Sequence, residues 1–93
     1  MHRSKLEMHI NILQVLADHG PLKITHLMYK VNLNGSTLKD CIEFLIKQGL
    51  VEEKSVGRGR FVYAITQRGR IVINVFEELK ELLPVTKENL VLL

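Results

Sequence analysis

Residues 50–70 of this chain have the sequence LVEEKSVGRGRFVYAITQRGR. Two runs that contain strand-forming residues, Leu50–Ser55 and Arg60–Ile65, flank a glycine-containing segment at 56–59. In the second run, large apolar or aromatic side chains recur at every other position, which is the spacing of one face of a strand. A glycine-containing turn between two such runs predicts a β-hairpin.

A long helix is predicted directly after this hairpin. Thr66 is suited to cap it and Pro84 cannot continue it, so we expect a helix at 67–83. Its apolar residues at or beside heptad positions are Val72, Val75, Phe76, Leu79, Leu82 and Leu83. These six residues are the predicted homodimer interface, because apolar side chains on more than one face favour burial on two sides. Two heptads also fit a helix that only covers its own domain.

Two helices are predicted at the start of the chain. Ser4 and Glu7 have the spacing of a capping box at the beginning of the first, and Gly20 and Pro21 end it. The apolar stripe expected to be buried on this helix is Leu6, Ile10, Leu13 and Ala17. A shorter helix follows at 23–31. Its expected apolar face is Ile24, Leu27, Met28 and Val31.

A third helix is predicted between a turn at 32–35 and Gly49. Asn34 is suited to be its N-cap, with Ser36 and Thr37 in the first turn. The residues expected to be buried on this helix are Leu38, Cys41, Ile42 and Leu45. The polar residues therefore face outward.

The predicted fold is mainly α with a small β-hairpin (α+β), in the order helix, helix, helix, strand, strand, long helix. Two short helices joined by a tight turn form a helix-turn-helix, and the hairpin after them is a wing. In three stretches, 27–33, 38–51 and 63–70 (YAITQRGR), the chain resembles the winged helix-turn-helix DNA-binding proteins of archaea and their viruses. This resemblance implies a small transcriptional regulator that dimerises through a C-terminal helix. Residues 1–66 are the expected winged domain, and 67–93 are a helix and tail in the same compact unit.

Length and charge narrow the possible functions. With 93 residues, the chain is one small domain, too short for a Rossmann or barrel enzyme. The net charge is only +3, but the basic residues at 54–70 have no acidic residue among them. A short cationic segment favours a polyanionic partner. No segment predicts a membrane span or a secretory signal, so we expect a cytoplasmic protein, in the host cytoplasm if it is viral.

The predicted DNA-binding residues lie in two parts of the chain. A recognition helix presents its first turns to base edges in the major groove. At the start of the third helix these residues are Asn34, Ser36, Thr37, Lys39 and Asp40. On the wing and after it they are Lys54, Arg58, Arg60, Arg68 and Arg70. Arg58 at the wing tip suits a minor-groove or phosphate contact. Arg68 and Arg70 occupy a helix N-terminus, where the helix dipole disfavours cations unless an anion is near. A DNA phosphate could be that anion, and the alternative is that the carboxylate of Glu52 or Glu53 neutralises the two arginines.

These features predict a dimeric, double-stranded DNA-binding regulator of transcription, but two other functions stay open. A non-specific architectural protein would use the same arginines without sequence preference. A winged helix can also dock a protein, which Asp40 and Glu43 favour slightly because they lie on the face that would meet phosphates. These two acids could instead accept a hydrogen bond from a cytosine, or pair with Lys39 or Lys47.

We expect no enzyme activity, metal, cofactor or small-molecule ligand. The histidines and Cys41 lack the spacing of metal ligands, and no nucleophile–base pair or phosphate-binding loop has a supporting pattern. Cys41 is predicted to be a core residue, with an intermolecular disulfide or redox sensing as the alternative. Tyr29 and Tyr63 are predicted at the edge of the core. The segment 85–93 is too apolar for a free tail and is expected to pack on something.

Overall fold

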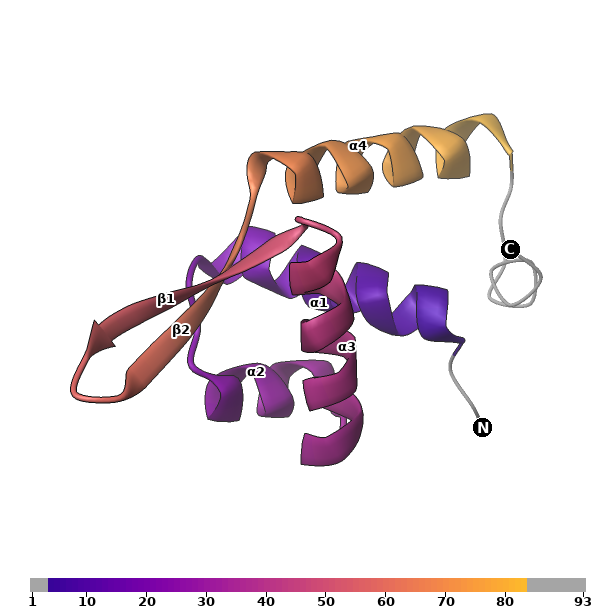
Figure 1. Cartoon of the computed structure of the whole chain (residues 1–93). Helices are drawn as coiled ribbons and strands as arrows, with labels where there is room; N and C mark the ends of the chain where they lie inside the picture. The colour runs from indigo at the N-terminus through magenta and orange to yellow at the C-terminus, as the bar shows by residue number, and fades with distance from the viewer. Residues whose placement is uncertain (1–3, 84–93) are drawn as a thin grey trace.

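The computed structural model describes residues 4–83, which form four helices and a two-stranded antiparallel sheet (Figure 1). In chain order the elements are α1 (Lys5–His19), α2 (Ile24–Val31), α3 (Gly35–Lys47), β1 (Val51–Gly57), β2 (Arg60–Ile65) and α4 (Gln67–Leu82). This order confirms the predicted fold class. The first strand was placed too early at 50–55, because strand pairing continues to Gly57, opposite Arg60. The predicted caps Ser4, Asn34 and Thr66 all form.

The core lies where α1, α2, α3 and the base of the hairpin meet. On α3 the predicted stripe is confirmed, since Leu38, Cys41, Ile42 and Leu45 are all buried. On α1 the prediction is only partly right. The fully buried residues there are Ile12, Leu13 and Leu16, whereas Leu6, Ile10 and Ala17 are only half-buried. The reason is that α1 contacts α2, α3, α4 and β2, so periodicity on α1 alone does not identify its most buried line.

On α2, Leu27 and Val31 are buried as predicted, but Ile24 is exposed. Tyr29 is not at the edge of the core: 82% of it is exposed. It follows Leu27 by two residues, which is roughly 200° around a helix and therefore on the opposite face. Tyr63 does pack against the core, as predicted.

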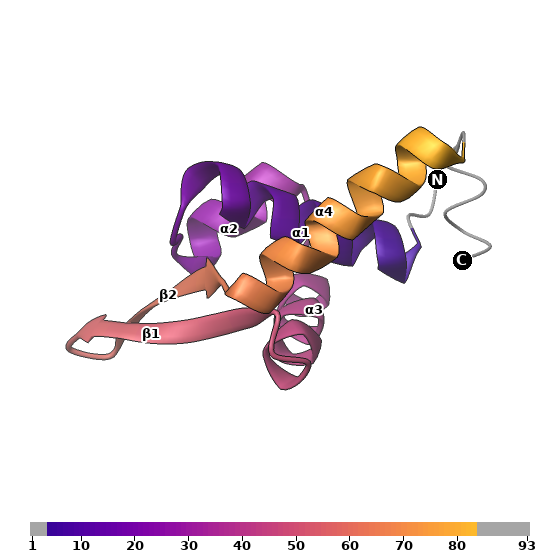
Figure 2. The same ribbon diagram turned by 90° about the horizontal axis from the view of Figure 1, so that it is seen from above.

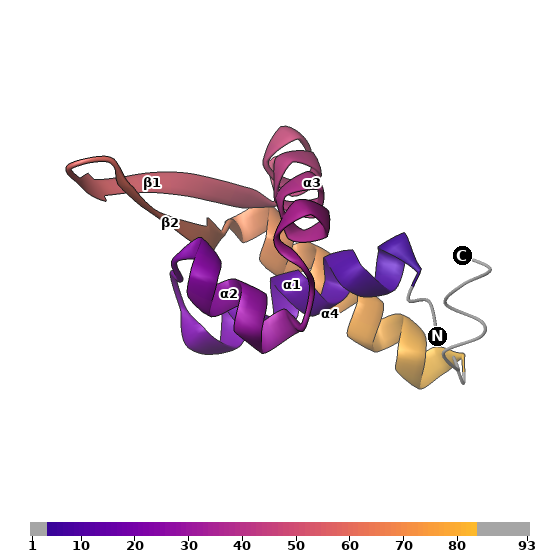
Figure 3. The same cartoon turned by 90° about the horizontal axis from the view of Figure 1, so that it is seen from below.

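The winged arrangement has two distinct sides. The hairpin and α3 project to one side of the molecule, and the far end of α4 lies on the other (Figures 2 and 3). The first turn of α1 and the last turn of α4 are both at the end opposite the wing tip (Figures 1 and 2). None of the described helices is long and apolar enough to pass through a bilayer.

A compact junction connects α4 to the end of α3. The Thr66 backbone N–H donates to the Leu50 carbonyl at 3.0 Å, and the Thr66 hydroxyl donates to the Gly49 carbonyl at 2.7 Å. The same hydroxyl oxygen accepts from the Gly69 N–H at 3.0 Å. Gly69 is buried against Leu50 and Ile65, and there is no room there for a side chain. The start of α4 is therefore fixed to the turn that ends α3.

Candidate nucleic-acid interface

The first turns of α3 form one part of the candidate interface. Asn34 is the N-cap, and its side-chain oxygen accepts from the Thr37 N–H at 2.8 Å. Ser36, Lys39 and Asp40 are exposed, whereas Thr37 is half-buried. The local sequence explains this placement, because an amide side chain at the N-cap satisfies one of the unpaired N–H groups of a helix start. Four of the five predicted residues on α3 and its cap are thus open to a ligand.

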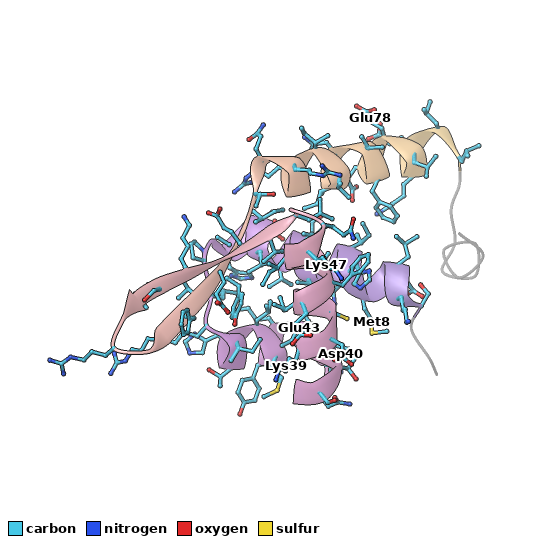
Figure 4. The ribbon with its side chains drawn as sticks, in the orientation of Figure 1. Met8, Lys39, Asp40, Glu43, Lys47 and Glu78 are labelled. Carbon is cyan, nitrogen blue, oxygen red and sulfur yellow. The ribbon has the colours of Figure 1, made fainter. Side chains whose placement is uncertain are left out.

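The outer face of α3 has both signs of charge. Figure 4 shows Lys39, Asp40, Glu43 and Lys47 along this helix, and all four are exposed. The ion pairs considered as an alternative role for Asp40 and Glu43 are not formed. Within residues 4–83, the ion pairs are Lys54–Glu52 and Lys80–Glu77. The two acids therefore remain available to donors on a ligand.

The wing tip is a two-residue turn with an unusual occupant. Gly57 pairs with Arg60, and the residues between them, Arg58 and Gly59, have φ angles of 47° and 72°. Positive φ angles at both central residues of a hairpin turn are a requirement of the type I′ turn, which strongly favours Asn-Gly or Gly-Gly at these positions. A residue such as arginine costs about 1–2 kcal/mol in this left-handed conformation. The chain thus places a cation at the wing tip against its local conformational preference.

The two glutamates of β1 do not neutralise the arginines after the wing. Glu52 pairs with Lys54 at 3.1 Å, and Glu53 accepts a hydrogen bond of 2.8 Å from the Tyr63 hydroxyl. Partial burial, and then this hydrogen bond to Glu53, raise the pKa of Tyr63 to about 12. The proposed neutralisation of Arg68 and Arg70 by these acids is therefore wrong. Both arginines are exposed in the first turn of α4, which contains no acidic residue.

The structure divides the predicted basic residues into three places. Arg58 and Arg60 are together at the wing tip. Lys54 and Arg70 line the same shallow hollow at the base of the wing. The stem of Arg68 lies instead beside the backbone at the end of α3. The candidate interface therefore extends from the wing tip to the base of the wing, and α3 projects on the same side of the molecule (Figure 3).

The predicted dimer residues of α4 are left partly uncovered by the domain. Of this set, Val75, Leu82 and Leu83 are exposed, and Val72, Phe76 and Leu79 are half-buried. The residue that α4 buries in the core is Ile73. Val75 is 57% exposed and Leu82 is 80% exposed, so an apolar face remains on this helix.

Sequence reasoning missed a cleft between α1 and α3, here called the α1–α3 cleft. It has a volume of about 460 Å³, and it is lined by Lys5, Met8, His9, Thr37, Asp40, Cys41 and Phe44. The rings of His9 and Phe44 stack across it with centroids 4.6 Å apart. Burial, and then the nearby Lys5 ammonium, lower the pKa of His9 below 6.5. The available signal was Phe44, a large apolar residue outside the predicted buried stripe of its helix.

In residues 4–83, no three His, Cys, Asp or Glu side chains gather as a metal site requires.

Several solved structures have the same fold. RV1404 from Mycobacterium tuberculosis aligns with a TM-score of 0.75 at 22% identity, over 80% of this chain and 52% of its own. MepR, a transcription regulator of the Staphylococcus aureus multidrug efflux pump MepA, aligns with a TM-score of 0.73 at 16% identity, over 80% of this chain and 56% of its own. Sso10a-2, a DNA-binding protein from Sulfolobus solfataricus, aligns with a TM-score of 0.73 at 24% identity, over 86% of this chain and 81% of its own. The chain thus spans about half the length of the first two proteins.

The sequence was also compared with family models and with curated proteins. No curated protein matches it. The winged helix-turn-helix model matches residues 2–84, which is most of the chain. The matched range includes every element of the fold and both parts of the candidate interface. The chain therefore belongs to the winged helix-turn-helix family.

Proposed function

We propose that this chain is a regulator of transcription that binds double-stranded DNA as a homodimer. In each copy, α3 enters the major groove, and Arg58 and Arg60 contact the minor groove or phosphates beside it. The proposal rests mainly on Arg58, which is held in a left-handed conformation at the wing tip. A backbone outlier of this kind supports a functional role, because another residue would satisfy the turn at lower cost.

The exposed start of α3 supports sequence readout. Ser36 and Lys39 can donate to base edges or phosphates, and Asp40 can accept from a cytosine amino group. Phosphate contacts from the basic residues of the wing and the start of α4 would supply much of the affinity. The residues proposed for these contacts are Lys54, Arg58, Arg60, Arg68 and Arg70.

The apolar face of α4 supports the homodimer. A two-fold dimer through this helix would present two α3 helices to successive major grooves, about 34–36 Å apart. Val72, Val75, Phe76, Leu79, Leu82 and Leu83 are the proposed interface. We take residues 1–66 as the winged helix-turn-helix domain, and 67–93 as the C-terminal helix and tail that form the dimerisation element of the same compact unit.

The compared structures support a non-enzymatic, DNA-binding role. MepR is a transcription regulator and Sso10a-2 is a DNA-binding protein. Sso10a-2 is also similar in size, since the match covers 81% of its own length.

Fluorescence anisotropy with duplex DNA over a salt series tests the proposal. We expect Arg58→Ala to weaken binding and to reduce the slope of log affinity against log salt by about one, as loss of one phosphate contact does. Lys80→Ala is the matched control, because it also removes one exposed cation, but from α4 next to Glu77. This variant should leave both quantities unchanged.

The DNA sequences used decide between the related functions. Stronger binding to the upstream region of the protein's own gene than to random duplexes supports the regulator. Salt-sensitive binding without sequence preference supports an architectural protein instead. Absence of binding at about 50 mM salt, where phosphate contacts are strong, would reject both and support a protein-docking module. The exposed acids Asp40 and Glu43 make that module the alternative.

A further inference from the structure

We propose that the C-terminal segment of this chain, residues 84–93, docks in the α1–α3 cleft. The segment lies outside the described residues, and its sequence is PVTKENLVLL. The docking is tested separately from DNA binding and from the homodimer, although Asp40 both lines the cleft and is a proposed DNA contact.

The cleft has the size and surface of an apolar binding site. Its volume of about 460 Å³ is within the ~300–1,000 Å³ typical of ligand clefts. Phe44 and Met8 form its apolar sides, and Cys41, only 6% exposed, is a third apolar lining residue. Phe44 itself is 45% exposed even though its ring stacks on His9. The ring thus has an uncovered apolar surface facing a concave site.

The C-terminal segment has the matching chemistry. Pro84 cannot extend α4, and the polar residues at 86–89 are followed by four consecutive apolar residues, Leu90–Leu93. Burial of apolar surface in a concave site is favourable in rough proportion to the area removed from water. A run of aliphatic side chains therefore suits a cleft lined by Met8, Cys41 and Phe44.

The segment can reach the cleft from the end of α4. Lys80 in the last turn of α4 lines a hollow together with Glu7 and Ile10, which lie on one face of α1. Lys5 and Met8, in the same first turns of α1, line the cleft on another face of that helix. A helix is about 10–12 Å wide with its side chains, whereas ten extended residues span about 33 Å. The path around the start of α1 is thus well within reach.

Covalent connection favours this segment over a second copy as the occupant. A short flexible tether gives an effective concentration of about 1 mM at a neighbouring site, far above the concentration of a dilute protein. The α4 face offers a second copy a separate apolar surface, with Val75 and Leu82 exposed.

Disulfide trapping in the full chain tests the contact, because Cys41 is the single cysteine of the sequence. Val91→Cys places a second thiol in the apolar run, and Lys87→Cys places one in the polar part as a matched control. Oxidised glutathione is added, and the 41–91 link is identified by peptide mass spectrometry and a non-reducing gel. At ~10 µM protein, we expect about a hundredfold more intrachain than interchain link for Val91→Cys, because the tether supplies a local concentration near 1 mM.

The reactivity of Cys41 without engineered cysteines gives a second readout. If the segment occupies the cleft about 90% of the time, Leu90→Ser/Leu92→Ser should react with a thiol reagent up to ~10-fold faster than the unmodified chain. Thr86→Ser/Asn89→Ser should react at the unmodified rate, and circular dichroism should show that each variant is folded. Equal trapping of Val91→Cys and Lys87→Cys, a predominant covalent dimer, or equal Cys41 reactivity in all forms would overturn the proposal.

Discussion

Arg58 has opposite consequences for folding and for the proposed function. Asparagine tolerates the left-handed conformation at this turn, so Arg58→Asn is expected to raise the free energy of unfolding by about 1 kcal/mol. The same change removes the wing-tip cation, so DNA affinity should fall. Urea denaturation and anisotropy measure the two effects.

Arg60→Asn is the matched control for this prediction. It removes the same charge, but from β2, where asparagine is a poor strand former. It should therefore lower stability rather than raise it. A stability loss in Arg58→Asn would mean that the arginine side chain stabilises the folded wing, and unchanged affinity would remove the wing tip from the interface.

Gly69 is the position where a single methyl group should be most damaging. A Cβ atom there would collide with the Leu50 carbonyl oxygen and would lie 2.6 Å from Ile65 Cγ1. Gly69→Ala should lower the free energy of unfolding by about 1–3 kcal/mol, although alanine is normally the better helix former. In Gly35→Ala the new Cβ atom would lie 3.8 Å from its nearest neighbour, Met28 Sδ, so no loss of stability from a steric clash is expected. Equal midpoints of urea unfolding for the two variants would contradict this explanation.

At the scale of single residues, local chemistry was predictable and tertiary surroundings were not. The caps Ser4, Asn34 and Thr66 follow from residue type and spacing, because a cap bonds to its own helix. The exposure of Tyr29 and the stacking of His9 on Phe44 depend on which elements pack together. The sequence pattern does not contain that information.

The contact between α1 and α3 should make stability depend on pH. The pKa of His9 is lowered in the folded state, whereas in the unfolded chain it returns to about 6.5. Below pH 6.5 the unfolded state therefore binds more protons, and the free energy of unfolding decreases as the pH falls toward the folded pKa. Above pH 6.5 this contribution is fully present.

Chemical denaturation between pH 7.5 and 5.5 measures this dependence. His9→Gln should flatten the profile, because the variant has no imidazole at the cleft. His26→Gln, on the exposed face of α2, should keep the slope of the unmodified protein. A titration of the His9 ring by NMR at or above pH 6.5 would contradict the prediction.

At the scale of elements, order and type were predictable, and boundaries were less so. Helix periodicity and glycine or proline stops located all four helices. The first strand was misplaced because its limit is set by pairing with Arg60 across the turn, not by its own residues. The stripe on α1 was partly wrong because four other elements contact that helix.

For the whole molecule, the exposed face of α4 leads to a test of assembly. Val75→Glu places a charge in the proposed apolar interface, and we expect it to shift the protein from dimer to monomer in sedimentation equilibrium. The folded protomer should be retained, because Val75 is already exposed to solvent in it. Tyr29→Glu makes the same kind of change on α2 and should leave the dimer intact. A monomeric unmodified protein, or a dimeric Val75→Glu variant, would reject this interface.

The architecture of the whole molecule was predictable because a helix-turn-helix followed by a hairpin has few alternative arrangements. The division of the candidate interface between the third helix and the wing was predictable, but the placing of Lys54 and Arg70 together at the base of the wing, with Arg68 beside the end of α3, was not. Phe44 indicated an apolar surface outside the buried stripe of its helix, but the α1–α3 cleft itself was not predictable, because it depends on the angle at which two helices pack.

The junction at Thr66 and Gly69 has a consequence for how two copies would measure DNA. Because the start of α4 is fixed to the end of α3, each half of the proposed dimer would move as one rigid unit, and the angle at which the two α4 helices cross would set the distance between the two α3 helices. A DNA site whose half-sites have a different spacing could then bind only one of the two α3 helices at a time. Loosening the junction would relax the permitted spacing between half-sites and leave the bases read within each half-site the same.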